Sequence, residues 1–485
     1  MTVSTLKKDI KKNPERIDKI CEMVFLAAVF VFTLMWAVKA PFDASPDEGM
    51  RYQIADYIMD YWRLPDGRDP AIRNANWGIS YAFNPITTYI IAAVFGKVTS
   101  FFTGGFKAIY ISMRLVNVIF GTLTSFLAIK TGKRLFDKKA AAWLFAALVS
   151  FLPGAVFVHS YINMDSIALF STAWIVYCWV RAVQEGWTTK ICIQLAVAMS
   201  VCALSYYNSY GFLLCSALLF VGMMMKCGEK QWNYQEMLKK GILILAVVFV
   251  LTGWWFIRNA ILYDGDILGM RTSSQYAEMY AIEELKPSNR ETPQNLGMTL
   301  FHMMIWIPGN WKYNWLVTVM VSFVGTFGHM DIFMPKMWSK VYLLVLFVGI
   351  LGNFFCAREH FHPSTKKVSE EVRKDEHGTT LIKTYRNEHV WNAANMMRLC
   401  MILAAIIPCI LLTYYAYTSD FQAQGRYIMP ALIPVMYFVT LGYECLLKKF
   451  VKSEKIQNIC LYAGVAAVIL SSVLVYLLVY AASYQ

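Results

Sequence analysis

Charged residues are scarce in this sequence, and their scarcity excludes an ordinary soluble protein. Asp, Glu, Lys and Arg make up 16% of the 485 residues, whereas hydrophobic residues make up 57%. Soluble domains contain about 25% charged and about 45–50% apolar residues. Apolar runs such as 24–40, 140–158 and 456–482 are long enough to cross a bilayer. The sequence therefore predicts an all-α integral membrane protein with many transmembrane helices.

The sequence also lacks a short-period repeat and a soluble domain of ordinary size. No cleavable-looking site follows the first apolar run, so the basic stretch before it is expected to be a cytoplasmic tail rather than a signal peptide. This leaves a chain made mostly of membrane helices and the loops between them.

The net charge of +13 is placed unevenly along the chain. Lys and Arg number six in residues 1–20, five in 130–139, four in 226–240 and four in 448–455. Because short basic loops stay on the cytoplasmic side, these segments and the loop 357–397 are expected inside. The charge thus reports topology, and we expect no nucleic-acid partner.

Counting apolar segments against this charge rule predicts a bundle of about 11 transmembrane helices. The segments 86–102 and 315–333 are expected to be external juxtamembrane or re-entrant helices, because counting 86–102 as a span would place basic loops on the wrong side. Two neighbouring spans, 190–206 and 209–225, are short for a full crossing. The predicted spans are about 22–40, 109–129, 140–158, 166–182, 190–206, 209–225, 241–260, 338–356, 398–417, 428–447 and 457–482.

This topology divides the chain into four regions. They are a basic tail (1–21), an N-terminal transmembrane module with an external loop (22–260, loop 41–108), an external loop with a re-entrant helix (261–337), and C-terminal helices with a cytoplasmic loop (338–485, loop 357–397). None of the 11 cysteines lies in 41–108, 261–337 or 418–427, so no disulfide framework is expected outside the membrane.

Ionisable and polar side chains near the membrane gather on the external side of this topology. Such groups are costly at membrane depth and are candidates for function. Segments far apart in the sequence contribute to one layer, which favours an active site over scattered structural charges. The residues are Asp47, Glu48, Arg114, His159, Asn163, Asp165, Arg258, Asn259, Asp264, Asp266, His329, Asp331 and Arg426.

Several of these residues also have local explanations. The pair Asp47 and Glu48 can cap the helix that follows, as Asp165 can for the next one. Arg258 can extend to the interface behind two tryptophans, and Arg426 can pair with Asp420. His159, His302 and His329 lack metal-ligand spacing and are expected to form local hydrogen bonds, and HFH at 360–362 is only a weak metal signal.

The chemistry that suits this set is transfer of a sugar from a lipid phosphate. An inverting transfer needs a carboxylate that accepts the acceptor's proton. It also needs cations that hold the leaving phosphate, for which the arginine fork is well matched. A donor embedded in the bilayer explains a site at the membrane surface.

Five stretches carry a resemblance to a known family: PDEGMRYQIADYI, NMDSIALF, GWWFIRNAILYDGDILG, SFVGTFGHMDIFMP and QAQGRYIMP. Together, over about residues 20–448, they resemble a bacterial family of polytopic proteins in the glycosyltransferase-C (GT-C) superfamily, which includes protein O-mannosyltransferases and lipid A aminoarabinose transferases. The resemblance implies a GT-C-like bundle and a glycosyltransferase that uses a polyprenyl-phosphate sugar.

The resemblance also implies roles for particular residues. Asp47 is the expected general base, with Glu48 as its neighbour or as a metal contact. Arg258, Arg426 and Arg114 are expected to contact the donor phosphate. The expected substrate-binding residues are Asn259, Asp165, Asn163, Asp264 and His329.

The sequence departs from the family pattern at two positions, and the resemblance also raises the question of a cofactor. Gly49 and its two successors stand where a proline and a histidine often follow the acids, and Asp264 is inserted before the glycine of the usual YGD. Some relatives bind a divalent metal at the acidic loop. A metal held by Asp47 and Glu48 is therefore possible here, and no cofactor is certain.

The resulting hypothesis is a bacterial cytoplasmic-membrane glycosyltransferase. Its amino terminus is expected in the cytoplasm, and its active site on the outer face. The expected partners are the lipid bilayer, a polyprenyl-phosphate sugar and a glycan or glycolipid acceptor. The alternatives are a flippase for a lipid-linked saccharide or a glycan polymerase or ligase. Transporters favour internal repeats and midplane charges, and neither is apparent in the sequence.

Overall fold

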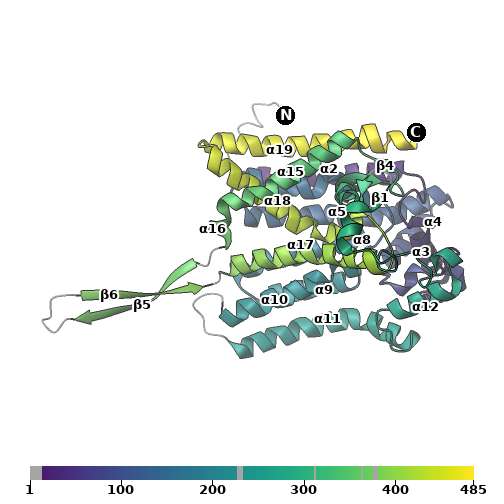
Figure 1. Ribbon diagram of the computed structural model, residues 1–485, viewed down its shortest axis with the longest axis horizontal. Helices are drawn as coiled ribbons and strands as arrows, with labels where there is room; N and C mark the ends of the chain where they lie inside the picture. The colour runs from purple at the N-terminus through teal and green to yellow at the C-terminus, as the bar shows by residue number, and fades with distance from the viewer. Residues whose placement is uncertain (1–13, 227–232, 311–312, 362–363, 375–380, 391) are drawn as a thin grey trace.

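The chain forms a helical bundle whose long helices run side by side along its longest axis (Figure 1). The computed structural model describes residues 14–226, 233–310, 313–361, 364–374, 381–390 and 392–485. The first part of the predicted basic tail and parts of the predicted loop 357–397 lie outside these residues. Helices α3 (Glu48–Tyr61), α4 (Thr87–Ser100) and α12 (Met270–Tyr280) lie at one end, opposite a protruding hairpin (Figure 1).

Within the described chain, nine helical segments are long and apolar enough to cross a membrane. A helix satisfies its own backbone hydrogen bonds, which is why apolar helices suit a bilayer. The prediction of an all-α membrane protein is confirmed. The nine segments contain α2 (Pro14–Lys39), α5 (Phe106–Leu135), α8 (Asp165–Glu185), α10 (Gly211–Lys226), α11 (Tyr234–Leu262), α15 (Lys336–Gly352), α17 (Ala393–Thr418), α18 (Leu432–Phe450) and α19 (Glu454–Val475).

Two of the eleven predicted spans correspond to shorter helices. The predicted span 140–158 is divided into α6 (Lys139–Phe151) and α7 (Pro153–Val158). Pro153 explains the break, because proline lacks an N–H and disfavours helical geometry at the residue before it; Leu152 is extended, with φ −62° and ψ 121°. The predicted span 190–206 becomes α9 (Thr189–Ala203), and the other nine each coincide with one long segment.

Both segments predicted to be external helices begin near the expected residues. The segment 86–102 forms α4. The segment 315–333 is not one helix: α14 (Trp315–Gly325) ends at the first glycine, and strands β3 (Thr326–Phe327) and β4 (Ile332–Phe333) pair antiparallel after it. Gly328 lies in the turn of this hairpin with φ +61°, a conformation that glycine adopts without strain.

The remaining elements are short, apart from the protruding hairpin. Strands β5 (Ser364–Lys374) and β6 (Leu381–Val390) pair antiparallel from Ser364 opposite Val390 to Lys374 opposite Leu381. The others are α13 (Leu300–Trp306), α16 (Ala357–Phe361), β1 (Pro308–Asn310), β2 (Tyr313–Asn314), η1 (Pro70–Ile72), η2 (Tyr81–Phe83), η3 (Tyr207–Ser209), η4 (Glu283–Leu285), η5 (Asn353–Cys356), η6 (Gly425–Ala431), η7 (Tyr476–Tyr480) and η8 (Ala482–Tyr484).

Two apolar cores position the end of the bundle that carries α3. The larger core is centred on α5, α6, α8 and α18 and buries Trp36 and Trp179 completely. A second core packs Ile54 of α3 and Tyr89 of α4 against Trp255 of α11. Burial of each large side chain contributes roughly 1.5–3 kcal/mol. The second core therefore fixes α3, which follows the acidic loop, against the long helices.

Candidate functional site

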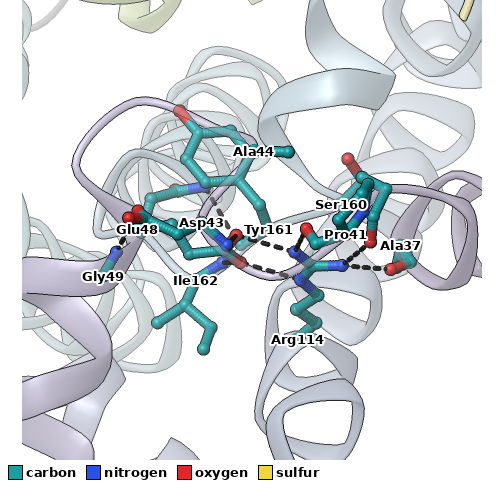
Figure 2. A network of polar contacts seen from close by, with 12 residues as sticks. Ala37, Pro41, Asp43, Ala44, Glu48, Gly49, Arg114, Ser160, Tyr161 and Ile162 are labelled. Carbon is teal, nitrogen blue, oxygen red and sulfur yellow. Dashed lines mark hydrogen bonds and ion pairs between the residues drawn. The ribbon is translucent and has the colours of Figure 1, made fainter. Parts of the chain in front are cut away.

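The loop between α2 and α3 is fastened by one buried ion pair (Figure 2). Arg114 of α5 donates from Nε and Nη2 to the two carboxylate oxygens of Glu48, each at 2.7 Å. Its remaining N–H groups donate to three backbone carbonyls, those of Ala37, Ala40 and Pro41, at 2.6–2.7 Å. Both side chains are 0% exposed. A guanidinium has five donors, and all five are used here.

Glu48 also holds two backbone segments in place. Its Oε1 accepts a hydrogen bond from the backbone N–H of Ile162 at 3.1 Å, and its Oε2 accepts one from that of Asp43 at 3.2 Å. These contacts tie the loop before α3 to the loop before α8 (Figure 2). Glu48 was predicted to be a catalytic residue, as the neighbour of the base or as a metal contact, and Arg114 was predicted to contact the donor phosphate. Their geometry instead favours a structural role, because neither side chain is accessible.

The backbone of the acidic loop is turned by two aspartates in the left-handed region. Asp43 and Asp47 both have φ +59°, which aspartate tolerates better than most residues. Asp47 occupies the cap position of α3, but its side chain makes no capping bond. Asp43 accepts from the backbone N–H of Gly49 at 2.7 Å instead. The proposed capping role of the acidic pair therefore falls to Asp43, and the Asp47 carboxylate is directed elsewhere.

Asp47 forms an ion pair with an arginine 379 residues further along the chain. The Nη2 of Arg426 donates to its Oδ2 at 2.7 Å. Arg51, one turn into α3, lies 3.6 Å from the same oxygen and 3.5 Å from the Oδ2 of Asp165 at the start of α8. The alternative pairing of Arg426 with Asp420 is wrong. Segments before α3, in α3, in α8 and in η6 thus meet in one charged cluster, defined as Asp47, Arg51, Asp165 and Arg426.

This charged cluster is buried but incompletely hydrogen-bonded. Arg51 and Asp165 have side chains only 3% and 2% exposed. Among the described residues, both carboxylate oxygens of Asp165, the Nε of Arg51 and the Nε of Arg426 have no hydrogen-bond partner. Buried polar groups are nearly always paired, since leaving one unpaired costs about 1–3 kcal/mol. Departures from this rule concentrate at functional sites.

Aromatic hydroxyls surround the charged cluster. The guanidinium of Arg51 lies over the ring of Tyr81 at 5.0 Å, and that of Arg426 lies over the ring of Tyr427 at 5.0 Å. The hydroxyl of Tyr427 accepts from Arg426 at 3.1 Å. Burial raises the pKa of Tyr81 well above its usual value, which keeps this phenol protonated. The lining is therefore polar yet water-poor, and such a lining strengthens interactions between charges.

The two arginines determine the charge of Asp47. Burial alone would raise the pKa of the Asp47 carboxyl, but the guanidiniums of Arg426 and Arg51 outweigh it and hold that pKa well below the usual value. The Asp47 side chain is also 29% exposed, whereas that of Glu48 is fully buried. Asp47 is therefore an ionised carboxylate that a substrate can reach.

A small cavity adjoins the charged cluster. Its volume is about 20 Å³, and Pro46, Ser322, Thr326, Gly328 and Arg426 contribute to its lining. A space of this size admits about one water molecule. A molecule larger than water must therefore approach Asp47 from its exposed side or displace the hairpin β3–β4 that forms part of the wall.

Arg258 lies in a different and larger groove. The groove has a volume of about 590 Å³, and Tyr57, Asp66, Trp254 and Ile261 contribute to its lining. The Nη2 of Arg258 donates to the backbone carbonyl of Pro65 at 2.7 Å, and its Nη1 is buried without a partner. Ile261 is 74% exposed. The lining thus combines apolar side chains with Arg63, Arg258 and two aspartates.

The other predicted substrate-binding residues are divided between structural and exposed positions. Asn163 accepts from the N–H of Ser166 in the first turn of α8 at 2.9 Å, and Asn259 donates to the carbonyl of Ile267 at 3.2 Å; both are 0% exposed. Asp264 is exposed. His329 Nε2 lies 2.8 Å from the carbonyl oxygen of Asp43. Of the five predicted substrate-binding residues, only Asp165 belongs to the charged cluster.

Local hydrogen bonding, expected for the histidines, is found for two of them. His159 Nδ1 lies 2.6 Å from the Ser166 hydroxyl, and His329 contacts the acidic loop as described. Arg51 is not among the site residues predicted from the sequence. Its position four residues after Asp47 on one helical face was the available signal, because such pairs lie side by side in a helix.

The acidic pair does not fit a divalent metal. Both Glu48 oxygens bind Arg114, and Asp47 lies against two guanidiniums. A cation at this position would be repelled by three arginines and would share no carboxylate pair. The side chains present therefore do not favour a metal at Asp47 and Glu48.

Comparisons with known proteins agree with this architecture. The family model for dolichyl-phosphate-mannose-protein mannosyltransferase matches residues 96–263. Two structures of the Archaeoglobus fulgidus oligosaccharyltransferase, one in the apo form and one in complex with Zn and sulfate, each align with a TM-score of 0.51 and 13% identity. They cover 95% and 92% of this chain. The chain spans 55% and 52% of their length, about half of those proteins.

ArnT from Cupriavidus metallidurans in the apo state also aligns, with a TM-score of 0.47, 13% identity and coverage of 93% of this chain and 69% of that one. No curated protein matches the chain by sequence. The family-model match to residues 96–263 and the shared helical fold agree with the predicted resemblance to the GT-C superfamily. The predicted resemblance to this superfamily and the predicted fold class are confirmed.

The buried Arg114–Glu48 pair yields a stability prediction. Replacing one partner, as in Arg114→Ala, leaves an uncompensated buried charge and is expected to cost about 3–5 kcal/mol of unfolding free energy. The matched control is Arg68→Ala, whose partner Asp66 lies 2.8 Å away with side chains 37% and 31% exposed; about 0–1 kcal/mol is expected there. Denaturant titration in detergent measures the unfolding free energy of both variants. Equal losses of unfolding free energy would contradict a stabilising role for the buried pair of Arg114 and Glu48.

Proposed function

We propose that this protein is a membrane glycosyltransferase that moves a sugar from a polyprenyl-phosphate carrier to an envelope glycan, polymer or glycolipid on the extracytoplasmic face. The observation that carries the proposal is the Asp47 carboxylate, which is accessible, ionised and held between Arg426 and Arg51. The family model matched by residues 96–263 describes enzymes named for a dolichyl-phosphate sugar. That name supports a polyprenyl-phosphate donor.

Asp47 is the proposed general base of an inverting transfer. The acceptor hydroxyl oxygen bonds to the anomeric carbon while the bond from that carbon to the phosphate oxygen breaks. The hydroxyl proton passes to Asp47, and the electron pair of the broken bond leaves with the phosphate. Glu48 cannot serve, because its carboxylate is fully buried and bound by Arg114. Asp47 is therefore the carboxylate of the acidic pair that can meet a substrate.

Arg426 is the proposed partner of the leaving phosphate. Its fork suits phosphate oxygens, and its Nε is among the buried donors of the described chain without a hydrogen bond. Asp47 with a strongly lowered pKa is a weak base. A donor phosphate competes with Asp47 for Arg426, and transfer of Arg426 to the phosphate raises the pKa of Asp47. Binding of the donor would thus prepare the base.

Arg258 has a separate role in this proposal. Its groove is lined by apolar side chains together with Arg258, Arg63 and two aspartates. We assign the anionic head of the lipid-linked substrate to this groove as it enters from the bilayer. Arg258 then contributes to binding, whereas Asp47 and Arg426 act in the chemical step.

The direct test is Asp47→Asn in the purified full-length protein. Transfer from a panel of radiolabelled undecaprenyl-phosphate sugars to envelope acceptors is expected to fall by about 10²–10⁴-fold, the usual contribution of a general base. Asp60→Asn is the matched control, because Asp60 is exposed on the same helix. It should retain transfer.

Two outcomes would contradict the proposal. Equal transfer by Asp47→Asn and the wild type would remove Asp47 as the base. Movement of lipid-linked sugar across vesicle membranes, with no transfer to any acceptor, would indicate the flippase of the sequence analysis instead.

The pH dependence of the rate tests the exchange of Arg426. In the free enzyme the lowered pKa keeps Asp47 ionised above the ordinary carboxyl value of about 3.9, so kcat/KM should be lost only as the pH falls below it. In the donor complex Arg426 has moved from Asp47 to the phosphate. The acidic limb of the profile of kcat against pH should therefore lie at higher pH. Arg426→Gln should shift the limb of kcat/KM upward too. Identical limbs for kcat and kcat/KM in the wild type would contradict the exchange.

Arg258→Ala tests the groove. Loss of a charge-assisted contact worth about 1.5–3 kcal/mol corresponds to a rise in KM for the lipid substrate of about 10- to 150-fold, with kcat little changed. Arg73→Ala is the control, because its guanidinium stacks on Tyr280 at 3.8 Å outside the groove lining. A fall in kcat at unchanged KM would instead place Arg258 in the chemical step.

A further inference from the structure

Three metal-ligating side chains meet at the end of the bundle opposite α3. They are Cys356 at the end of η5, His360 in α16 and Cys445 in α18, and their ligand atoms all lie within 4.8 Å of one another. The Sγ of Cys445 lies 3.8 Å from the Nε2 of His360. In Figure 1 this position is close to the base of the hairpin β5–β6, far from α3 and α4. In the sequence, HFH at 360–362 is only a weak metal signal, and nothing there connects it to a cysteine.

The spacing of these atoms suits a tetrahedral ion. Zinc binds cysteine sulfur at about 2.3 Å and histidine nitrogen at about 2.0–2.1 Å, so neighbouring ligands on a tetrahedron lie roughly 3.5–3.8 Å apart. The observed 3.8 Å between the Sγ of Cys445 and the Nε2 of His360 is slightly longer than the roughly 3.6 Å of a bound sulfur–nitrogen pair, so a small movement of the side chains would bring both onto one ion. Cys356 and His360 are four residues apart in consecutive helical turns, which places them on one face.

Glycine packing brings the two helices close enough for this arrangement. A Cβ on Gly352 would lie 2.3 Å from the carbonyl oxygen of Gly442, and one on Gly442 would lie 1.7 Å from that of Gly349. Helices α15 and α18 therefore touch backbone to backbone. Cys356 follows Gly352 by one turn and Cys445 follows Gly442 by three residues, so the close contact carries both thiols toward each other.

The backbone around His360 is also held. The Nη1 of Arg398 in α17 donates to the carbonyl of His360 at 3.0 Å, and its Nε donates to the hydroxyl of Tyr437 in α18 at 3.1 Å. The Nδ2 of Asn353 donates to the carbonyl of Phe438 at 2.7 Å. These contacts fix η5, α16 and α18 relative to one another without using the three ligand atoms.

Burial and charge also fit a soft divalent ion. Cys356 and Cys445 are 7% and 3% exposed, whereas His360 is half-buried. Two thiolates and a neutral imidazole around one divalent cation sum to zero net charge, which lowers the cost of burial. The partial exposure at His360 gives a water molecule access to a fourth position. Sulfur and imidazole ligands select zinc over calcium or magnesium.

We propose that Cys356, His360 and Cys445 bind one zinc ion, which fastens the end of α15 to α18 at the base of the hairpin β5–β6. Binding releases the two thiol protons to solvent and forms two zinc–sulfur bonds and one zinc–nitrogen bond. The site lies at the opposite end of the bundle from Asp47, and it is independent of the proposed transfer reaction.

The test uses Co²⁺ and Zn²⁺ with the full-length, reduced protein in detergent. Co²⁺ is expected to give thiolate charge-transfer and tetrahedral d–d absorption at one ion per chain, and Zn²⁺ should displace it. Cys356→Ser and Cys445→Ser should abolish the thiolate band or weaken binding by more than about 100-fold, since a lost direct ligand exceeds the 10–100-fold effect of an outer partner. His360→Ala should weaken binding while leaving a thiolate band.

Cys400→Ser is the matched control, because Cys400 is a buried thiol on α17 and is not part of the cluster. It should bind Co²⁺ like the wild type. Wild-type spectra from both Cys356→Ser and His360→Ala would overturn the proposal, as would the absence of a thiolate band in the folded, reduced wild-type protein. Binding of Zn²⁺ to the three residues is also expected to raise the midpoint of thermal unfolding. A midpoint that does not change with Zn²⁺ would contradict the fastening role.

Discussion

The buried contact between Arg114 and Glu48 is the interaction on which the end of the bundle that carries α3 depends. An unpaired charge in this position would be strongly destabilising, and here each charged group has its full set of partners. The pair joins the end of α2, the start of α3 and the loop before α8. Because Glu48 is fixed, Asp47 before it is fixed as well, and the Asp47 carboxylate contacts Arg426 and Arg51 instead of Arg114.

Two charged groups with contrasting properties thus lie side by side. The Arg114–Glu48 pair is saturated, because every N–H donor of the Arg114 guanidinium forms a hydrogen bond. The cluster of Asp47, Arg51, Asp165 and Arg426 is open, with ion-pair distances of 3.5 and 3.6 Å beside one short contact and with unpaired buried atoms. A saturated pair stabilises a fold, whereas an unsaturated one can exchange partners with a substrate. This contrast is the physical basis for assigning chemistry to Asp47 and not to Glu48.

The opposite end of the bundle is organised by a different constraint. No side chain separates α15 from α18 at Gly349, Gly352 and Gly442, and backbone contact replaces side-chain packing. This close contact determines which side chains meet just beyond it, and they include two thiols and an imidazole. The proposed reaction and the proposed zinc site therefore depend on separate contacts at separate ends. Either can be lost without loss of the other.

The sequence by itself determined the class of protein and most of its helices, because hydropathy and proline or glycine breaks act over a few turns. It also singled out Asp47, Asp165 and Arg426, whose charges are unusual beside apolar spans. Only the tertiary structure decided the partners: Arg426 reaches Asp47 across 379 residues, Arg114 is consumed by Glu48, and Arg258 lies in another groove. Pairing of this kind depends on how helices pack, and local sequence carries no record of which distant side chain completes an ion pair.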